Sequence, residues 1–189
     1  MKAIKLSVIV LLAIVLQSCK EYLDIIPDNV ATIDYAFHLR SSAERYLFTC
    51  YSYLPNNGNV GVNPGFNAAD EVWYSYPMDA TGISESVSNI ARGLQNSQSP
   101  LVNYWSGGNQ GKPYFQAIRD CNTFLENIDD VVDLEEYERE RWKAEVTFLK
   151  AYYHFFLVRM YGPIPLIKEN LPLESTTEDV KVYRQPLDE

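Results

Sequence analysis

The chain has 189 residues, of which 47% are hydrophobic and 13% aromatic, and its formal net charge is −9. Nucleic-acid-binding proteins present basic patches, so a chain this acidic is a poor match for nucleic acid, and electrostatics do not draw it to an anionic membrane. The length suffices for one or two domains, and tyrosine is unusually abundant, with 14 residues.

The first residues have the pattern of a secretory signal peptide. Lys2 and Lys5 precede an apolar run, Leu6 to Leu16, of about eleven residues, where a membrane-spanning helix needs roughly twenty. The alternative is a buried N-terminal helix, but the run has no polar face and no cap. Residues 1–18 contain two lysines and no acids, so a chain starting at residue 19 carries a net charge of −11.

The end of this run resembles a bacterial lipobox. The stretch "LQSC" places a leucine three residues before Cys19 and a small residue just before it. The resemblance implies cleavage before Cys19 and acylation of both its sulfur and its new amine; stable anchoring takes more than one acyl chain. Glu21 and Asp24 resemble the surface-export signal of Bacteroidetes lipoproteins. We therefore predict a lipoprotein signal peptide at 1–18 and lipidation at Cys19, which anchors the protein in the membrane.

A helical region is predicted from Ala31 to Leu54. Leu47, Cys50 or Tyr51, and Leu54 recur at three- and four-residue steps, and "PNNG" then ends the helix.

The two cysteines beyond residue 19, Cys50 and Cys121, each lie at an apolar position of a predicted helix. We favour buried free thiols, with a disulfide as the alternative. No CxxC pair or Cys/His cluster indicates a metal site, and we predict no cofactor.

Residues Asn56 to Gly111 form a different kind of segment, rich in Asn, Gly, Ser and Pro with aromatic residues interspersed. Its periodicity is weak. Loops without secondary structure rarely run this long unless they carry function, so we expect short helices to interrupt it.

Two further helices are predicted, at Pro113–Ile128 and Asp133–Met160. The first has one apolar stripe, made of Tyr114, Ile118, Cys121, Leu125 and Ile128. Asp133, with Glu136 three residues later, resembles a capping box at the start of the second helix.

The second helix has two apolar stripes. One consists of Trp142, Val146, Leu149, Tyr153, Phe156 and Met160, and a second, expected beside it, of Ala144, Phe148, Ala151, Phe155 and Val158. A helix with two such stripes packs between neighbours. A short link makes the two helices an αα-hairpin similar to the unit of tetratricopeptide repeats, so the predicted fold is all-α, with helical hairpins and long aromatic-rich loops.

The second helix also carries a family resemblance. "AEVTFLKAYYHFFLVRMYGPIPLI", residues 144–167, closely resembles the signature segment of SusD/RagB outer-membrane lipoproteins. The matching positions are Ala144, Glu145, Phe148, Leu149, Lys150, Ala151, Tyr161, Gly162, Pro165 and Leu166. "SCKEYLDIIPDN", "YWSGGNQGKPYFQAIRDCNTFLENID" and "VYRQPLDE" are similar to other family segments, in the same order.

The resemblance implies a non-catalytic lipoprotein at the bacterial outer surface. It would capture an oligosaccharide and pass it to a SusC-like TonB-dependent transporter in the outer membrane. Some relatives of the RagB type bind peptides instead. Family members are much longer than this chain, so the resemblance implies that residues 19–189 are an incomplete N-terminal region, in which the two-striped helix lacks some packing partners.

The aromatic-rich segment offers groups that suit a glycan. Sugar C–H faces stack on aromatic planes, and sugar hydroxyls pair with Asn, Gln, Asp and Arg. The ligand-facing residues that we predict are Trp73, Tyr74 and Tyr76, with Asp70 or Asn67 as polar partners. The alternative for each ring is packing within the loop. Trp105, by its family position, is expected to anchor the following helix instead.

An enzyme such as a surface glycosidase is the competing class, and a purely structural repeat protein is a third. A glycosidase needs two carboxylates at a defined separation. Asp70 and Glu71 are neighbours in the sequence, so their side chains are expected to point in different directions. His38 and His154 are too isolated to form a dyad, so a solvated or capping role is expected for each. No Ser/His/Asp order or glycine-rich phosphate loop occurs in the sequence.

Overall fold

The computed structural model describes residues 33–59, 63–69, 73, 85–109, 111–172 and 174–186, and these parts of the chain contain helices and no strand. The helices are α2 (Ile33–Ala36), α3 (Arg40–Ser52), α4 (Pro64–Asn67), α5 (Glu85–Ala91), α6 (Tyr114–Asn127), the 3-10 helix η1 (Ile128–Asp130) and α7 (Glu136–Tyr161). The predicted all-α fold class is therefore confirmed. Of the helices described, none has the length and apolar character that crossing a membrane requires.

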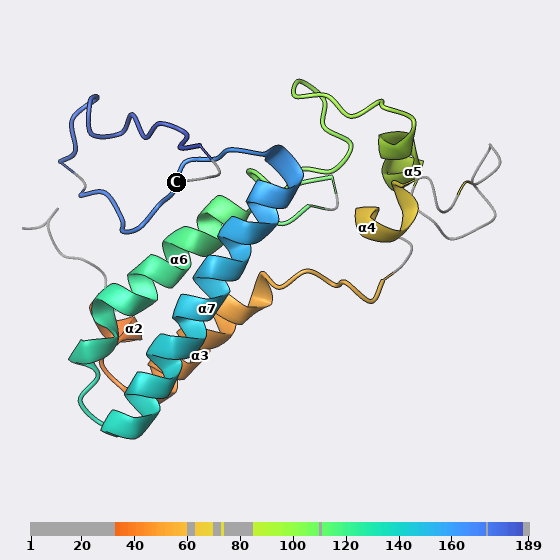
Figure 1. Ribbon diagram of the computed structural model, residues 1–189. Coiled ribbons are helices and arrows are strands. Elements are labelled where there is room, and N and C mark those ends of the chain that lie inside the picture. Colours follow the sequence, from red (N-terminus) through yellow and green to blue (C-terminus); the bar gives the residue numbers. More distant parts are fainter. Residues whose placement is uncertain are drawn as a thin grey trace, which may run out of the picture. The chain divides into compact units, whose positions relative to one another are not determined.

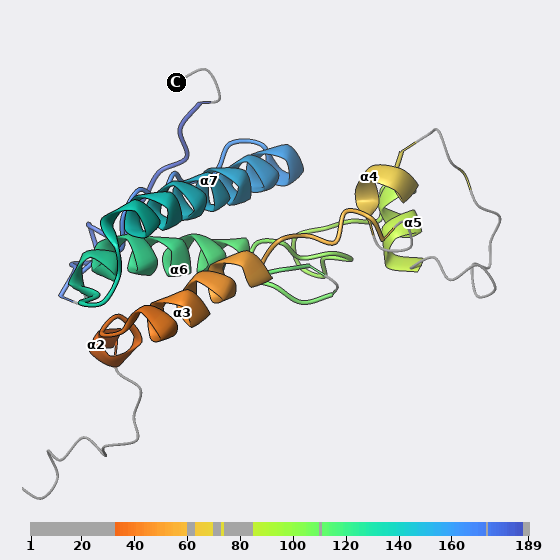
Figure 2. The same cartoon turned by 90° about the horizontal axis from the view of Figure 1, so that it is seen from below.

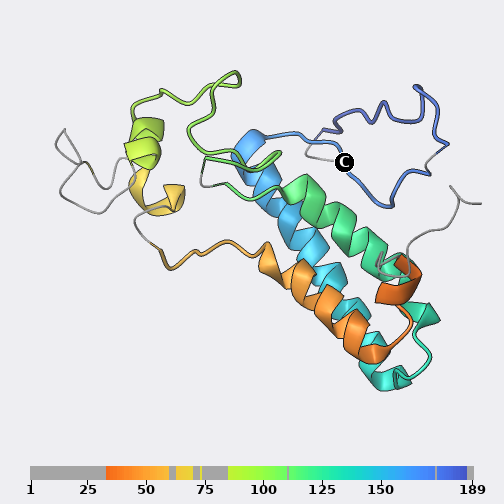
Figure 3. The ribbon, with the colours of Figure 1, turned by 180° about the vertical axis from the view of Figure 1, so that it is seen from behind.

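Helices α3, α6 and α7 lie side by side and form a three-helix bundle (Figures 1, 2 and 3). α6 and α7 are antiparallel and joined by η1 and a short link, which confirms the predicted αα-hairpin. α3 is antiparallel to α6. Phe37, before α3, packs its ring 5.7 Å from that of Phe124 near the end of α6, whereas Lys112, before α6, donates to the carbonyl of Ser52 at the end of α3 over 2.5 Å.

The bundle core is built from the predicted helix stripes. On α6 the buried members are Tyr114, Ile118 and Cys121, followed by Ile128 in η1, while Leu125 is half-buried. On α7 the buried members are Trp142, Val146, Leu149, Tyr153 and Phe156, and Met160 is half-buried. We call the α7 set the inner stripe. The predictions of the α6 stripe and of the inner stripe of α7 are confirmed, because apolar residues at three- and four-residue steps share one face of a helix.

The second apolar stripe of α7 does not lie beside the inner stripe, as the sequence suggested, but on the opposite side of the helix. At 100° per residue, Ala144, Phe148, Ala151 and Phe155 turn away from the core. Phe148 is 68% exposed and Phe155 55%, and both alanines are exposed. We call these four residues the outer stripe. Within the described parts of the chain, no other element buries it; Val158, the fifth residue expected there, is half-buried.

The predicted capping box at Asp133 is wrong. α7 begins at Glu136 with Glu135 as its N-cap, and the Glu135 side chain makes no capping hydrogen bond. The Asp133 carboxylate instead accepts from the backbone N–H of Arg40 over 2.5 Å, so it caps α3. The Arg40 guanidinium also binds both carboxylate oxygens of Glu138, at 2.7 and 2.6 Å, and lies over the Trp142 ring. These contacts join the starts of α3 and α7, which therefore run parallel.

The predicted helical region at residues 31–54 is broken in two. The chain turns at residues 37–39 between α2 and α3, and Phe37, which is 1% exposed, inserts its ring against those of Tyr46 and Phe124. Leu47 and Cys50 are buried as expected, but α3 ends at Ser52, and Leu54 beyond it is exposed.

Gly162 ends α7 with a φ of 72°, a backbone conformation that favours glycine. The following segment returns along α7, where the Ile167 N–H donates to His154 Nε2 over 3.2 Å and Lys150 Nζ binds the Lys168 carbonyl. His154 Nδ1 lies 2.8 Å from the Lys150 carbonyl, which indicates a neutral ring protonated at Nδ1. Of the two roles expected for His154, solvated or capping, the solvated one is wrong, because His154 is 8% exposed and its ring accepts a backbone N–H of the returning segment.

Cys50 and Cys121 are buried free thiols, as the sequence favoured. They meet between α3 and α6, where a hydrogen bond with the Cys121 thiol, followed by burial, raises the pKa of Cys50 well above its usual range. Tyr153 donates to the Cys50 carbonyl over 2.5 Å and so ties α7 to the same point of the core.

Candidate ligand-binding surface

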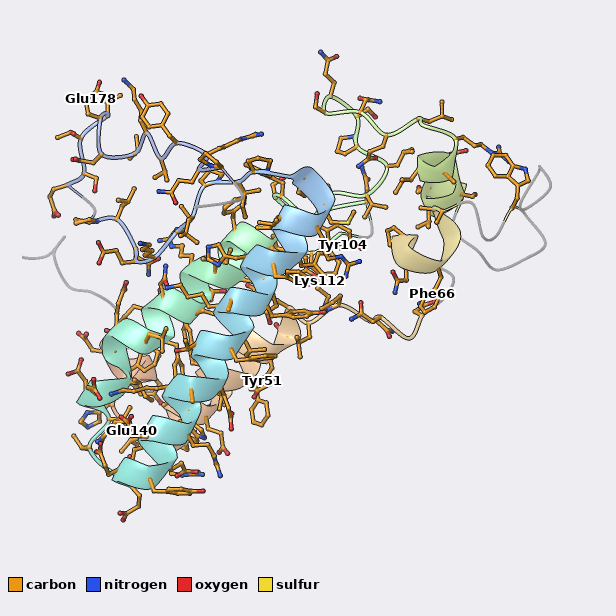
Figure 4. All side chains as sticks on the ribbon, in the orientation of Figure 1. Tyr51, Phe66, Tyr104, Lys112, Glu140 and Glu178 are labelled. Carbon is orange, nitrogen blue, oxygen red and sulfur yellow. The ribbon has the colours of Figure 1, made fainter. Side chains whose placement is uncertain are left out.

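Short helices interrupt the aromatic-rich segment, as predicted. α4 begins at Pro64, which suits the first turn of a helix, and Asn63 caps it by accepting from the Gly65 N–H over 2.9 Å. The same Asn63 side chain donates to the Asn57 carbonyl over 2.9 Å. α4 packs against α5, and Phe66 on α4 is 52% exposed (Figure 4).

Trp73 presents the most exposed tryptophan ring of the described residues, with 66% of its surface accessible. The guanidinium of Arg92, just after α5, lies 5.7 Å from the centre of this ring in a cation–π arrangement. A ring held in this way offers a flat apolar surface beside a donor with fixed fork geometry. Together, such groups can stack on a sugar face and donate to its hydroxyls.

The structure places the predicted site residues unequally. Trp73 is exposed, as a ligand-stacking residue must be. Asn67 is the last residue of α4, and only its backbone is described. Asp70, Tyr74 and Tyr76 lie outside the described residues, and so does the predicted lipidation site, Cys19. Their assigned roles therefore stay predictions.

Arg92 was not among the residues predicted from the sequence. Arg92 is the only Lys or Arg in the sequence of residues 56–111. The other side chains of this segment are neutral or acidic. A single cation among several aromatic residues was the available signal, because guanidinium groups pair readily with aromatic faces.

Most side-chain amides of the loop before α6 are engaged by the loop itself. Gln95 donates to the Val102 carbonyl over 2.9 Å and accepts from the Leu101 N–H over 2.6 Å. Asn96 accepts from two backbone N–H groups, and Asn103 accepts from those of Trp105 and Ser106. These amides fix the loop in the manner of Asx turns. They are consequently less available to a ligand than the composition of the segment suggests.

A close backbone approach within the same loop requires glycine at residue 111. A Cβ there would collide with the Asn103 carbonyl, and Gly111 instead exchanges backbone hydrogen bonds with Gly108 at 2.9 and 3.2 Å. The loop is thus closed by backbone contacts just before α6 begins.

Tyr104 and Trp105 belong to the framework. Figure 4 shows Tyr104 where α6 begins and α7 ends; its ring stacks on Tyr114 at 5.5 Å and its N–H donates to the Tyr161 hydroxyl over 2.9 Å. Trp105 packs against Phe115 of α6 at 4.6 Å and against Tyr161 of α7. This geometry confirms that Trp105 anchors the following helix.

The buried tyrosines and His154 of the bundle have the character of packing residues. Burial raises the pKa of Tyr104, Tyr114 and Tyr153, so their hydroxyls stay protonated, and burial lowers the pKa of His154. In the parts of the chain that the structure describes, no group of three or more His, Cys, Asp and Glu side chains could hold a metal ion. Among the described residues, the Trp73–Arg92 surface is thus the best candidate for ligand contact.

Comparison with known proteins gives two matches. The model of the SusD-like family described as "Starch-binding associating with outer membrane" matches residues 21–189. A curated protein of Formosa agariphila, "SusD-like protein P25", is 26% identical over 179 residues, which cover 92% of this chain and 33% of that protein. The chain therefore spans about a third of the length of this relative. No solved structure matches the chain.

Proposed function

This chain belongs to the SusD-like family, and from that premise we propose that it forms part of a non-catalytic, glycan-binding lipoprotein of the bacterial outer membrane. The observation that carries the proposal is the family match over residues 21–189, because the family is described as starch-binding and associated with the outer membrane. The resemblance drawn from residues 144–167 is thereby confirmed at the level of the family.

In this proposal the ligand is an oligosaccharide and Trp73 is its stacking platform. The exposed ring and the guanidinium 5.7 Å from its centre support this role, since they combine an apolar plane with hydrogen-bond donors. Asn67, Asp70, Tyr74 and Tyr76 complete the proposed contact set. The bundle serves as the scaffold.

The proposed setting is the outer-membrane surface beside a transporter. Lipidation at Cys19 would supply the anchor, which the acidic chain cannot obtain from attraction to anionic lipid. A SusC-like TonB-dependent transporter would receive the captured glycan. Residues 19–189 are then the N-terminal region of a longer protein, as the one-third coverage of the relative suggests.

Affinity electrophoresis tests the ligand class. The whole gene product should migrate more slowly in native gels that contain soluble starch or another polysaccharide, and Trp73→Ala should reduce this retardation. Tyr137→Ala is the matched control, because it removes another exposed aromatic ring, 80% accessible, from α7. Equal retardation of the Trp73 variant would remove Trp73 from the site, and release of sugar products from the polysaccharide would favour an enzyme.

Membrane fractionation tests the anchor. Cys19→Ala should move the protein from the membrane fraction to the soluble fraction and abolish incorporation of labelled palmitate. Lys20→Ala, the neighbouring substitution, should leave both unchanged. An unchanged distribution of the Cys19 variant would refute lipid anchoring without bearing on glycan binding.

A further inference from the structure

The turn that follows α3 contains an asparagine–glycine pair at its tip. Asn57 is the only asparagine in the sequence that is followed by glycine, and both Asn57 and Gly58 are exposed. The turn is closed by the Asn59 N–H, which donates to the Asn56 carbonyl over 3.1 Å. An exposed turn tip of this kind leaves both residues open to water and to changes of backbone conformation.

The backbone nitrogen of Gly58 is available as a nucleophile. Among the described residues, no acceptor binds the Gly58 N–H, whereas the N–H groups on either side of it both donate to carbonyls of the turn. Because Gly58 directly follows Asn57, its nitrogen can close a five-membered ring on the Asn57 carboxamide carbon. A side chain on the residue that supplies the nitrogen would hinder this approach, and glycine has none.

The fold itself does not require glycine at residue 58. The φ of Gly58 lies outside the left-handed region, and a Cβ there would lie 3.8 Å from the Asn56 side chain, which is an ordinary van der Waals distance. In this respect it differs from Gly111, where a Cβ would collide with a carbonyl. Gly58→Ala is therefore expected to preserve the turn, so the chemistry of the pair can be tested in an intact fold.

We propose that Asn57 is a site of spontaneous deamidation in the folded protein. The Gly58 nitrogen gives up its proton to water or hydroxide and attacks the Asn57 carboxamide carbon. The bond from that carbon to the amide nitrogen then breaks, and the departing group takes up a proton and leaves as ammonia. Water opens the resulting succinimide at one of its two carbonyls and gives aspartate or isoaspartate. The reaction consumes one water molecule and needs no other reactant.

Deamidation changes the contact between this turn and α7. The Asn57 side-chain amide donates to the Tyr152 hydroxyl over 3.1 Å, and the Asn57 backbone carbonyl accepts from Asn63, the cap of α4. Both products carry a carboxylate, which cannot donate to Tyr152, and isoaspartate also adds a methylene to the main chain. The modification therefore adds one negative charge and alters the link that leads from α3 to α4.

Ageing of the purified whole gene product in mildly alkaline buffer tests the proposal, because the attacking nitrogen must lose its proton. Peptide mapping by mass spectrometry, after digestion at acidic pH, should show the mass change from amide to carboxyl in the Asn57 peptide. An unaged sample gives the starting level, and a methyltransferase specific for isoaspartate should label the aged peptide. Gly58→Ala should slow the conversion about tenfold.

Asn96 provides a matched control within the same protein. It is also exposed, but a serine follows it and its side-chain oxygen accepts from two backbone N–H groups of its own loop. It should therefore convert at least about tenfold more slowly than Asn57. This comparison needs no substitution, so it decides the question even if Gly58→Ala disturbs folding.

Three results would overturn the proposal. The first is an Asn57 that stays unmodified in the folded protein. The second is equal conversion at Asn57 and Asn96. The third is an unchanged rate in a Gly58→Ala variant that unfolds at the same urea concentration as the wild type.

Discussion

The three-helix bundle and the α4–α5 region use aromatic side chains in opposite ways. In the bundle, Tyr104, Tyr114 and Tyr153 form successive stacked pairs at 5.5 and 5.4 Å and are almost fully buried. In the α4–α5 region, Phe66 and Trp73 are more than half exposed. Aromatic abundance alone therefore does not identify a ligand surface. A ring whose face meets an apolar helix stripe becomes core, and one without such a partner stays available.

The largest expected difference between the two regions concerns ring removal. Phe124→Ala should lower the free energy of unfolding by about 3–5 kcal/mol, because this ring is fully buried against Phe37 and Tyr46. Phe66→Ala, at an exposed ring, should change it by less than about 0.5 kcal/mol. Urea titrations followed by circular dichroism measure both. Similar losses for the two variants would erase the distinction between core and exposed rings.

Removing a tyrosine hydroxyl should have different effects at two positions of the bundle. Tyr53 donates to the Asp120 carboxylate over 2.6 Å, so Tyr53→Phe should destabilise the protein by about 1 kcal/mol. The buried Tyr114 hydroxyl has no hydrogen-bond partner among the described residues, so Tyr114→Phe should be neutral or stabilising. The same titrations test both. A Tyr114→Phe variant that is less stable than Tyr53→Phe would contradict this account of the core.

A smaller effect is expected from pH. Burial lowers the pKa of His154 below the ordinary 6.5, and its Nε2 accepts the Ile167 N–H only when neutral. The unfolded chain therefore takes up this proton first on acidification. The contribution of His154 to stability is fully present above about pH 6.5 and is lost as the pH falls through the lower folded-state pKa.

Comparing variants at the two histidines isolates this contribution. His154→Gln should flatten the decline of thermal stability between neutral pH and about pH 5, whereas His38→Gln, at an exposed histidine, should leave it unchanged. Identical pH profiles for the wild type and the His154 variant would show that the neutral ring does not hold the returning segment.

The sequence predicted the parts of the fold that local periodicity controls. The hairpin of α6 and α7 and the inner stripe both follow from residue spacing. The role of Asp133 could not be predicted in this way, because the N–H group that it caps belongs to Arg40, 93 residues earlier. The break before α3 likewise depends on the long-range fit of Phe37 against Phe124.

The candidate site was only partly predictable. Trp73 was identified from composition, and its exposure agrees with that role. The number of amide side chains in the loop is a poor guide to how many can bind a ligand. Gln95 and Asn103, for example, form hydrogen bonds with the backbone of their own loop. These side chain–backbone hydrogen bonds depend on the three-dimensional path of the loop and cannot be predicted from composition. A cation–π pair such as Trp73 and Arg92 requires only that one aromatic and one basic residue lie close together.

The most direct test of the central claim is calorimetric titration of the whole gene product with a soluble starch oligosaccharide. We expect measurable binding that Trp73→Ala weakens by about tenfold, equivalent to the loss of roughly 1.4 kcal/mol from one stacking contact. Tyr137→Ala should bind like the wild type, and all three proteins should unfold at the same urea concentration. Wild-type affinity in a correctly folded Trp73→Ala variant would contradict the claim that this surface holds the glycan.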